Sequence, residues 1–253
     1  MMKVIVNADD LGLNQDVNDA IFDLMSKRVV TSATMMANGP TILRAIEVSK
    51  HFPSCSFGIH LNLTELRPLG RPEGLQKLLN ENGDFNGALD RTPGTVKKSW
   101  GLLSAIAQEW SRQIELIGNA GVEISHLDSH QHVHTIPFLF PVLKYVQAKY
   151  GIRKVRSTRN VYRVGKTPSQ ITLYAKRTFQ QALTKCYRTR TTAAFMDLST
   201  FYERVVVGKE TWSSAEVMVH PGSSFDDEEN RLLCTDWLNQ SSGNLRLISY
   251  LEL

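Results

Sequence analysis

Residues 126–134 read His-Leu-Asp-Ser-His-Gln-His-Val-His and begin inside a predicted strand over residues 123–128. The stretch holds four of the chain's seven histidines: His126, His130, His132 and His134. Zn, Mn, Fe and Ni share imidazole and carboxylate ligands, and oxygen-rich sites suit Mg. A closed structural zinc site would need cysteine pairs at short spacing, so the pattern indicates an open catalytic site with further ligands elsewhere. The alternative is a polar surface loop.

The residues around this stretch favour an alternating α/β chain. Expected strands cover residues 3–8, 29–37, 56–63, 123–128, 153–157, 193–196 and 215–219, with a last extended piece at 245–250. Expected helices cover residues 15–27 with Asn14 as cap, 41–51, 95–119, 138–150, 168–187 and 228–238. Residues 64–94 form a long, irregular insertion, which is typical of a substrate loop or lid. The alternation predicts a parallel sheet or barrel, and we expect a single domain over residues 1–253.

Reactive side chains stand at the ends of several of these strands. They are Asp9, Asp10, His60, Asp128, His130, Arg156 and His220. In barrel enzymes the active site is built from the carboxyl ends of several strands. This agreement between pattern and placement predicts catalysis. Because adjacent side chains diverge in a strand, Asp9 and Asp10 need a turn over residues 9–12 to reach one cleft together; a simple turn or helix-cap pair is the alternative.

Composition sets broad limits. The chain has 253 residues, of which 42% are hydrophobic and 21% charged, so a normal core is expected. Its three cysteines, Cys55, Cys186 and Cys234, form no disulfide framework and suggest a reducing compartment. Neither a signal-peptide core nor an apolar run of membrane-spanning length is apparent, so we expect a cytoplasmic protein. We expect Trp100 and Trp110, at helical core spacing, to be packing residues.

The charge is uneven along the chain. No Asp or Glu occurs between Asp128 and Asp197, and this span carries thirteen Lys and Arg from Lys144 to Arg190. Such asymmetry suggests nucleic acid or an anionic ligand, although a solvated basic surface would look the same.

Four motifs together resemble the YdjC-like carbohydrate deacetylase family, which includes chitooligosaccharide deacetylases. They are Asn-Ala-Asp-Asp-Leu-Gly at 7–12, Gly-Ile-His-Leu-Asn-Leu-Thr at 58–64, the stretch 126–134, and His-Pro-Gly at 220–222. The resemblance implies a distorted (β/α) barrel of the glycoside hydrolase/deacetylase type with about seven parallel strands. It also implies removal of acetyl groups from N-acetylated sugars with a divalent metal ion, Mg or Zn first and Mn, Co or Ni as alternatives.

The same resemblance implies roles for single residues. Metal ligands would be Asp10, His60 and His130, with Asp9 as general base and His220 as general acid. Asp128 is expected to hold a ligand histidine by its second ring nitrogen. In an extended segment His132 and His134 would share the side of His130 and bind substrate or a second metal, or only border the cleft.

Arg156 would stabilise an oxyanion, hold Asp9, or form a plain salt bridge. We expect His126 to be structural.

The leading hypothesis is a metal-dependent hydrolase that deacetylates N-acetylated sugars or short chitooligosaccharides. Alternatives are another metal-dependent hydrolase, such as a phosphoesterase that uses the basic span, and a non-enzymatic sugar- or nucleic-acid-binding protein. Under the leading hypothesis the partner is a small carbohydrate, and we expect neither membrane nor nucleic-acid binding. A homodimer is possible, and the basis for it is that homodimers are the commonest assembly.

Overall fold

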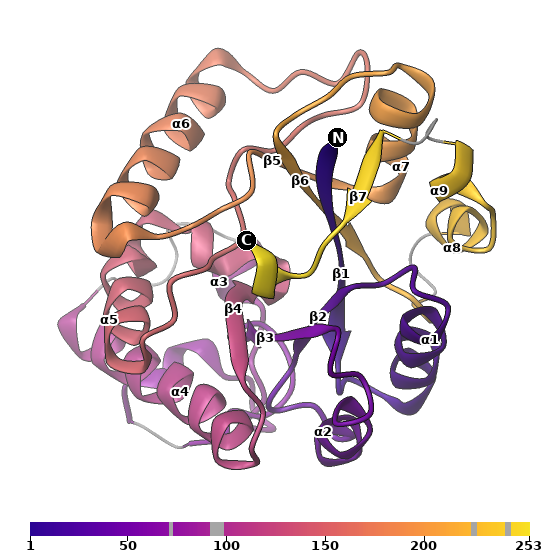
Figure 1. Ribbon diagram of the computed structural model, residues 1–253. Coiled ribbons are helices and arrows are strands. Elements are labelled where there is room, and N and C mark those ends of the chain that lie inside the picture. Colours follow the sequence, from indigo (N-terminus) through magenta and orange to yellow (C-terminus); the bar gives the residue numbers. More distant parts are fainter. Residues whose placement is uncertain (71–72, 92–98, 224–226, 241–243) are drawn as a thin grey trace.

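Parallel strands surrounded by helices make up the structure, a computed structural model that describes residues 1–70, 73–91, 99–223, 227–240 and 244–253 (Figure 1). In these residues the strands are β1 (Met2–Leu11), β2 (Ser32–Met35), β3 (Ser56–Leu61), β4 (Ile124–Ser129), β5 (Ala194–Asp197), β6 (Ser214–Val219) and β7 (Leu245–Leu247). The longer helices are α1 (Gln15–Ser26), α2 (Ile42–Ser49), α4 (Trp100–Asn119), α5 (Phe140–Tyr150) and α6 (Gln170–Lys185). Short helices are α3 (Ala88–Arg91), α7 (Leu198–Phe201), α8 (Asp227–Leu233) and α9 (Trp237–Gln240). The predicted α/β class is therefore confirmed.

The strands form one parallel sheet in the order β4-β3-β2-β1-β6-β5, with β7 paired to β1 beside that path. β1 lies at its centre, and Val4, Ile5 and Val6 are fully buried. Such a continuous run of β-branched residues is typical of a strand that is covered on both faces.

Residues 153–161 lie between the two edge strands of this sheet. A single parallel bridge joins Leu127 of β4 to Val155, and another joins Asn160 to Phe195 of β5. The predicted strand over 153–157 was wrong in extent, because only isolated residue pairs reach the neighbours on either side. The arrangement fits the distorted barrel that the motifs implied, with an incomplete ladder at this position.

The sequence signals for helices correctly predicted the longer helices that surround the sheet. The Asn14 side chain accepts a hydrogen bond from the backbone N–H of Val17 at 2.9 Å and caps α1, as predicted. In α4, Trp110 is fully buried, whereas Trp100 is 85% exposed, so the expectation of a packing role was wrong for Trp100. Trp100 lies in the first turn, where the helix projects beyond the core.

The predicted loop over 64–94 is a packed wall where it is described. It contains a 3₁₀ segment, η1 (Glu73–Leu78), and α3, and its buried residues include Leu75 and Phe85. The backbone N–H groups of Leu69 and Gly70 donate to the buried Glu109 carboxylate of α4 at 3.0 and 2.9 Å. These anchors argue against a free lid. Residues 71–72 and 92–94 of this prediction, and 95–98 of the predicted helix 95–119, lie outside the described residues.

Two predictions near the C-terminus needed correction. The single helix expected over 228–238 is two short helices, α8 and α9, with the turn at Cys234–Asp236 between them. The extended piece expected over 245–250 is a strand only to Leu247, and then forms a 3₁₀ turn, η6 (Tyr250–Glu252), capped by Ser249. This turn buries Tyr250 completely.

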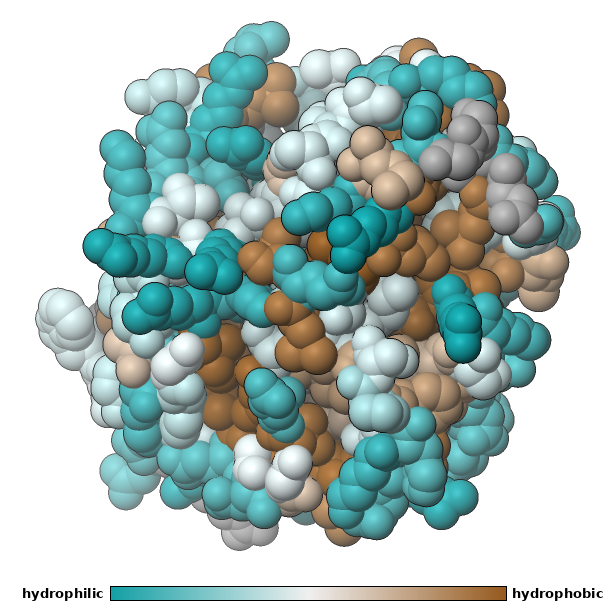
Figure 2. Space-filling view, in the orientation of Figure 1, coloured by the Kyte–Doolittle hydropathy of each residue, from teal (hydrophilic) through white to brown (hydrophobic). Residues whose placement is uncertain are grey.

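The outer surface is mixed in character. Figure 2 shows hydrophilic side chains around most of the periphery, especially on the side of α5 and α6, with apolar patches toward the centre of this face. Among the described residues, no helix is both long and apolar enough to cross a membrane. The three cysteines are free thiols.

Candidate active site

A cleft of about 800 Å³ opens where the parallel strands end at their carboxyl termini. Its lining joins predicted residues from four distant segments: Asp9, Asp10, His60, His130, His132 and His220. Asp128 and Arg156 lie beneath it and contact these side chains. The topology therefore gathers the reactive residues of the sequence at one end of the sheet, as expected for a parallel α/β enzyme.

The two adjacent carboxylates reach this cleft through a bulge in β1, and the predicted turn follows one residue later than expected, closed by a hydrogen bond from the Leu13 N–H to the Asp10 carbonyl at 3.0 Å. β1 continues to Leu11, but its register against β2 shifts between Ala8 and Leu11. Asp10 has φ +66°, a left-handed conformation that Asp tolerates better than most residues. This kink rotates Asp10 so that its side chain can join that of Asp9, which a regular strand would prevent.

Asp10 lies at the centre of the three residues implied as metal ligands. Its Oδ1 is 2.9 Å from His130 Nδ1 and 3.2 Å from His60 Nε2. Ligand atoms bound at about 2.0–2.1 Å to one ion, at angles of about 90–110°, lie about 2.9–3.4 Å apart. One carboxylate and two imidazoles with this spacing fit a divalent ion and suit Zn, Mn, Co or Ni without excluding Mg.

The electrostatics of the three residues also suit a cation. Burial alone would raise the pKa of Asp10, but hydrogen bonds with His130 and His60 hold it well below the usual range. Burial lowers the pKa of His130, but bonds to Asp10 and Glu65 outweigh this and raise it to about 9. For His60, Asp128 and Asp9 likewise outweigh burial and raise the pKa well above its ordinary value. Protons on His60 and His130 thus place positive charge beside the neighbouring carboxylates, at the position where a metal ion would place it.

His60 and His130 each contact Asp10 through one ring nitrogen and a second carboxylate through the other ring nitrogen. His60 Nδ1 lies 2.7 Å from Asp128 Oδ1, which is the supporting contact expected of Asp128. His130 Nε2 lies 3.1 Å from Glu65 Oε1. Such partners fix the ring orientation of metal-binding histidines. The sequence analysis missed Glu65, and its only signal was a carboxylate shortly after the strand that ends near His60.

Arg156 is buried under the cleft and binds three carboxylates. Its Nη1 and Nη2 donate to both Asp9 oxygens at 2.7 and 2.6 Å, its Nη2 lies 2.7 Å from Asp128 Oδ2, and its Nε donates to Glu216 at 2.8 Å. With 1% of its side chain exposed, Arg156 holds Asp9 and is not placed to meet an oxyanion in the cleft. Glu216, which accepts a further hydrogen bond from Tyr250 Oη, was missed by the sequence analysis.

This network determines the state of Asp9. Burial alone would raise the pKa of Asp9, but the charge and hydrogen bonds of Arg156 outweigh it and keep the pKa far below the usual range. Asp9, His60 and Asp128 also lie close enough to hold a cation. Because Arg156 already supplies positive charge to Asp9 and Asp128, the Asp10 group is the better candidate metal centre.

His220 stands at the open side of the cleft, with 34% of its side chain exposed. Its Nε2 is 3.9 Å from Asp9 Oδ2, and its Nδ1 is 3.8 Å from Glu229 Oε1. Burial would lower the pKa of His220, but Glu229 and Asp9 outweigh it and raise the pKa. A protonated imidazole beside an ionised carboxylate is a suitable proton donor.

His132 and His134 do not follow His130 in an extended segment. They lie in a 3₁₀ segment, η2 (His130–Thr135), in which Gln131 and His132 have left-handed φ of 49° and 55°. His134 is buried against the Ser129 hydroxyl, whereas His132 lines both the cleft and an adjoining hollow of about 380 Å³. Burial, then the nearby Arg156 charge, lowers the pKa of His132 to about 3, so this ring is neutral.

His126 lies away from the cleft. Its ring stacks on Tyr250 with the ring centroids 3.6 Å apart, and Ser125 Oγ lies 2.8 Å from its Nδ1. This packing agrees with the structural role expected for it.

The described lining of the cleft contains four acidic residues and no Lys or Arg. The acids are Asp9, Asp10, Asp16 and Glu65. These carboxylates suit a bound cation, because their negative charge would stabilise it.

Comparison with known proteins gives three kinds of match. The family model described as YdjC-like protein matches residues 3–242. A carbohydrate deacetylase from Geobacillus stearothermophilus is 38% identical over 157 residues, which cover 61% of this chain and 60% of that protein. One from Halalkalibacterium halodurans is 36% identical over 160 residues, which cover 63% and 65%, and one from Vibrio vulnificus YJ016 is 39% identical over 161, which cover 62% and 59%. The chain thus matches about three fifths of the length of these curated relatives.

The fold also matches a solved structure. A crystal structure from Enterococcus faecalis V583, provisionally described as a cellobiose-phosphate cleavage protein, superposes with a TM-score of 0.77. The superposition covers 99% of this chain and 98% of that chain at 22% sequence identity, which establishes similarity of fold.

Proposed function

This chain belongs to the YdjC-like protein family, and from that membership and the geometry of the cleft we propose that it is a metal-dependent carbohydrate deacetylase. The proposed reaction is hydrolysis of the acetamide of an N-acetylated sugar or short chitooligosaccharide. One observation carries the proposal: Asp10 Oδ1 lies within 3.2 Å of nitrogen atoms of both His60 and His130, in the cleft that also contains Asp9 and His220. The names of the curated relatives support the substrate class.

Asp10, His60 and His130 would hold the ion, with Asp128 and Glu65 fixing the two rings. A divalent ion at this position would polarise the amide carbonyl and acidify a water molecule, which an amide requires because it is a poor electrophile. Asp10 enters this role ionised, since its pKa lies well below neutrality.

Asp9 would accept the proton of the attacking water. Arg156 binds both oxygens of Asp9 and fixes the plane of its carboxylate. The same contacts lower the pKa of Asp9 and make it a weak base, so it takes a proton only from a water molecule that is already acidified. In this proposal Arg156 is a positioning residue.

His220 would donate a proton to the departing amine. It lies on the exposed side of the cleft, and its raised pKa keeps a substantial protonated fraction near neutral pH. Asp9 and His220, 3.9 Å apart, would then act as a base and an acid on one reacting amide.

The charge of the cleft bears on the phosphoesterase alternative. No Lys or Arg occurs in the described cleft lining. With a metal ion bound, His60 and His130 would be neutral ligands, which leaves His220 as the cationic side chain there. A phosphate ester usually needs several cationic groups or metal ions to bind. A neutral N-acetyl sugar has no such need. The cleft therefore favours the amide hydrolase.

The test measures metal binding and acetate release on diacetylchitobiose, with Mg, Mn, Zn, Co or Ni added. The parent protein is compared with His130→Ala and with His51→Ala, a control that removes an exposed histidine far from the cleft. We expect metal-dependent acetate release in the parent and in the control, and its loss in His130→Ala. Acetate release that survives EDTA and His130→Ala would overturn the mechanism. Metal binding with phosphate released from 4-nitrophenyl phosphate, and no acetate, would favour the phosphoesterase.

A further inference from the structure

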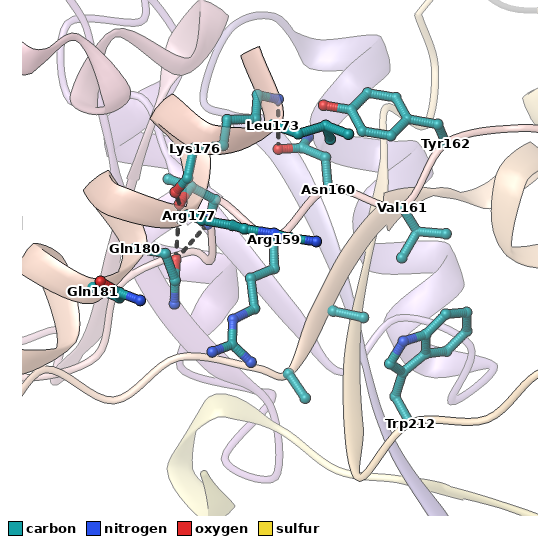
Figure 3. Close-up of a pocket in the computed structure, with 13 residues that line it drawn as sticks. Arg159, Asn160, Val161, Tyr162, Leu173, Lys176, Arg177, Gln180, Gln181 and Trp212 are labelled. Carbon is teal, nitrogen blue, oxygen red and sulfur yellow. Dashed lines mark hydrogen bonds between the residues drawn. The ribbon is translucent and has the colours of Figure 1, made fainter. Parts of the chain in front are cut away.

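Besides the cleft and the hollow of about 380 Å³ that adjoins it, a further hollow of about 440 Å³ lies between α6, residues 158–162 and the start of β5, near Trp212 (Figure 3). We call it the α6 hollow. We propose that the α6 hollow binds a phosphate monoester that carries a ring. The α6 hollow shares Thr158, Asn160 and Lys176 with the hollow beside the cleft but no lining residue with the cleft itself, and the proposal does not depend on the deacetylase function.

Charge is the first observation. The lining of the α6 hollow includes Arg159, Lys176 and Arg177 and contains no acidic residue. Both walls come from the acid-free span between Asp128 and Asp197, so the uneven charge of the sequence is concentrated here. The nearby cleft has the opposite character, with four acids and no described Lys or Arg. The unbalanced positive charge of the α6 hollow therefore attracts an anion.

The second observation is that the two arginines lack a carboxylate partner. Some surface arginines are paired, for example Arg163 with Glu228 at 2.6 Å and Arg246 with Glu252 at 2.9 Å. Others, such as Arg44, have no such pair among the described residues; what sets Arg159 and Arg177 apart is that both line one hollow. Within the part of the chain that the structure describes, no ion pair is formed by Arg159 or Arg177. Exposed guanidinium groups in a concave wall present the paired N–H donors that phosphate oxygens bind.

The third observation is an unsatisfied hydroxyl on Tyr162, whose ring lies near Lys176. The Tyr162 hydroxyl is buried and has no hydrogen-bond partner among the described residues. The Lys176 ammonium lies 5.2 Å from the centre of the Tyr162 ring and donates to Asn160 Oδ1 at 2.8 Å. A buried polar group without a partner is uncommon, and a bound ligand is one way to satisfy it.

Size and shape define the rest of the ligand. About 440 Å³ falls in the range of small-molecule sites and is far more than a bare phosphate fills. Figure 3 shows the Trp212 indole at one side of the hollow, across from Gln180 and Gln181. An indole provides a flat surface on which a ring can stack, while the amides provide further donors and acceptors. These features select a ring-bearing phosphate monoester over inorganic phosphate.

The experiment is isothermal titration calorimetry with AMP, glucose 6-phosphate, adenosine and inorganic phosphate as probes. AMP and glucose 6-phosphate distinguish a base from a sugar as the ring, while adenosine and phosphate test each half alone. Arg159→Gln, Arg177→Gln and the double variant are compared with Arg44→Gln, which removes the same charge from the exposed side of α2. His130→Ala tests binding in the cleft instead.

We expect at least one phosphate monoester to bind more tightly than adenosine or phosphate. Each single pocket variant should weaken binding by about tenfold or more, and the double variant should abolish it, because each guanidinium makes charge-assisted bonds. Arg44→Gln and His130→Ala should bind like the parent, and all variants should keep the parental circular dichroism spectrum.

Three results would overturn the proposal. They are the absence of monoester binding up to about 10 mM, equal binding by the double variant, and loss of binding in His130→Ala. Tighter, strongly salt-dependent binding of a single-stranded oligonucleotide than of AMP would instead assign the basic surface to nucleic acid.

Discussion

Replacing Arg156 with methionine should destabilise the protein through the carboxylates that it leaves behind. The guanidinium binds Asp9 by two bonds, Asp128 by one and Glu216 by one, all in a fully buried site. Methionine fills much of the same volume but neutralises none of these charges. The packing loss is therefore small, and the electrostatic loss dominates.

The magnitude depends on which carboxylate loses most. Asp128 keeps contacts with His60 and Thr34, and Glu216 keeps the Tyr250 hydroxyl. Asp9 keeps a hydrogen bond from the neutral Asn7 Nδ2 at 2.9 Å, and its nearest remaining cationic contact is His220 Nε2 at 3.9 Å. Removal of one partner from a buried ion pair costs about 3–5 kcal/mol. Since domains are stable by only about 5–15 kcal/mol, Arg156→Met should be folded but marginal near neutral pH.

The pH dependence separates this cause from a packing defect. In the parent protein Arg156 depresses the pKa of Asp9, so the stability from this pair is present above the unfolded pKa of about 3.9 and is lost only as pH falls below it. In the variant, only the smaller effects of the His60 and His220 charges still oppose burial, so the pKa of Asp9 rises. The variant should therefore gain stability as pH falls from about 7 to about 5, by up to about 1.4 kcal/mol per pH unit for one proton. The difference in the free energy of unfolding between the parent and the variant should narrow from about pH 7 to about pH 5.

Urea unfolding of the metal-free proteins, followed by tryptophan fluorescence, measures this difference at each pH. Arg163→Met is the matched control, because Arg163 forms an exposed pair with Glu228 whose loss should cost less than about 1 kcal/mol and show no narrowing. The reasoning fails if Arg156→Met costs less than about 1 kcal/mol at neutral pH. It also fails if the difference stays constant as the pH is lowered.

Three further predictions concern the metal centre and the core. Glu65→Gln should weaken divalent metal binding about 10–100-fold in calorimetric titration without moving the urea midpoint, because Glu65 orients the His130 ring; unchanged affinity would contradict this. The affinity for a divalent metal should rise from about pH 6.5 to about pH 9, because the pKa of His130 is raised to about 9 and the ion must displace its proton. A metal affinity that stays constant over this pH range would refute that. Trp110→Ala should cost about 3–5 kcal/mol in urea unfolding and Trp100→Ala less than about 0.5, since the first side chain is fully buried and the second 85% exposed; equal losses would contradict it.

Most of the fold could be predicted because strong local signals agreed with one another. The β-branched run at residues 3–8, the Asn14 cap and the apolar spacing of α4 each identified an element that the structure contains. Boundaries were less accurate where tertiary contacts decide them. Residues 153–157, for example, look like a strand in isolation but pair only through single bridges with two offset neighbours.

The gathering of the cleft residues was predictable, whereas their conformations and supporting contacts were not. The carboxyl ends of parallel strands meet at one end of the sheet, so Asp10, His60 and His130, which stand at such ends, were expected to lie together. The left-handed backbone at Asp10 and His132 depends on the surrounding packing and leaves no clear sequence signal. Glu65 and Glu216 were missed for a related reason, since a contact between residues far apart in sequence, such as Glu216 with Arg156, becomes visible only in three dimensions.

The central position of β1 has a consequence for synthesis of the protein. β1 leaves the ribosome well before β6, which pairs along one of its edges and follows about 200 residues later. At about 5–20 residues per second the nascent chain spends roughly 10–40 s with that edge unpaired. Arg156 follows Asp9 by 147 residues, and Glu216 follows Arg156 by a further 60, so the buried ion-pair network is completed only near the end of this interval. An apolar strand edge exposed for so long is a target for misassociation, so we expect this protein to depend on chaperones during translation more than its size alone would suggest.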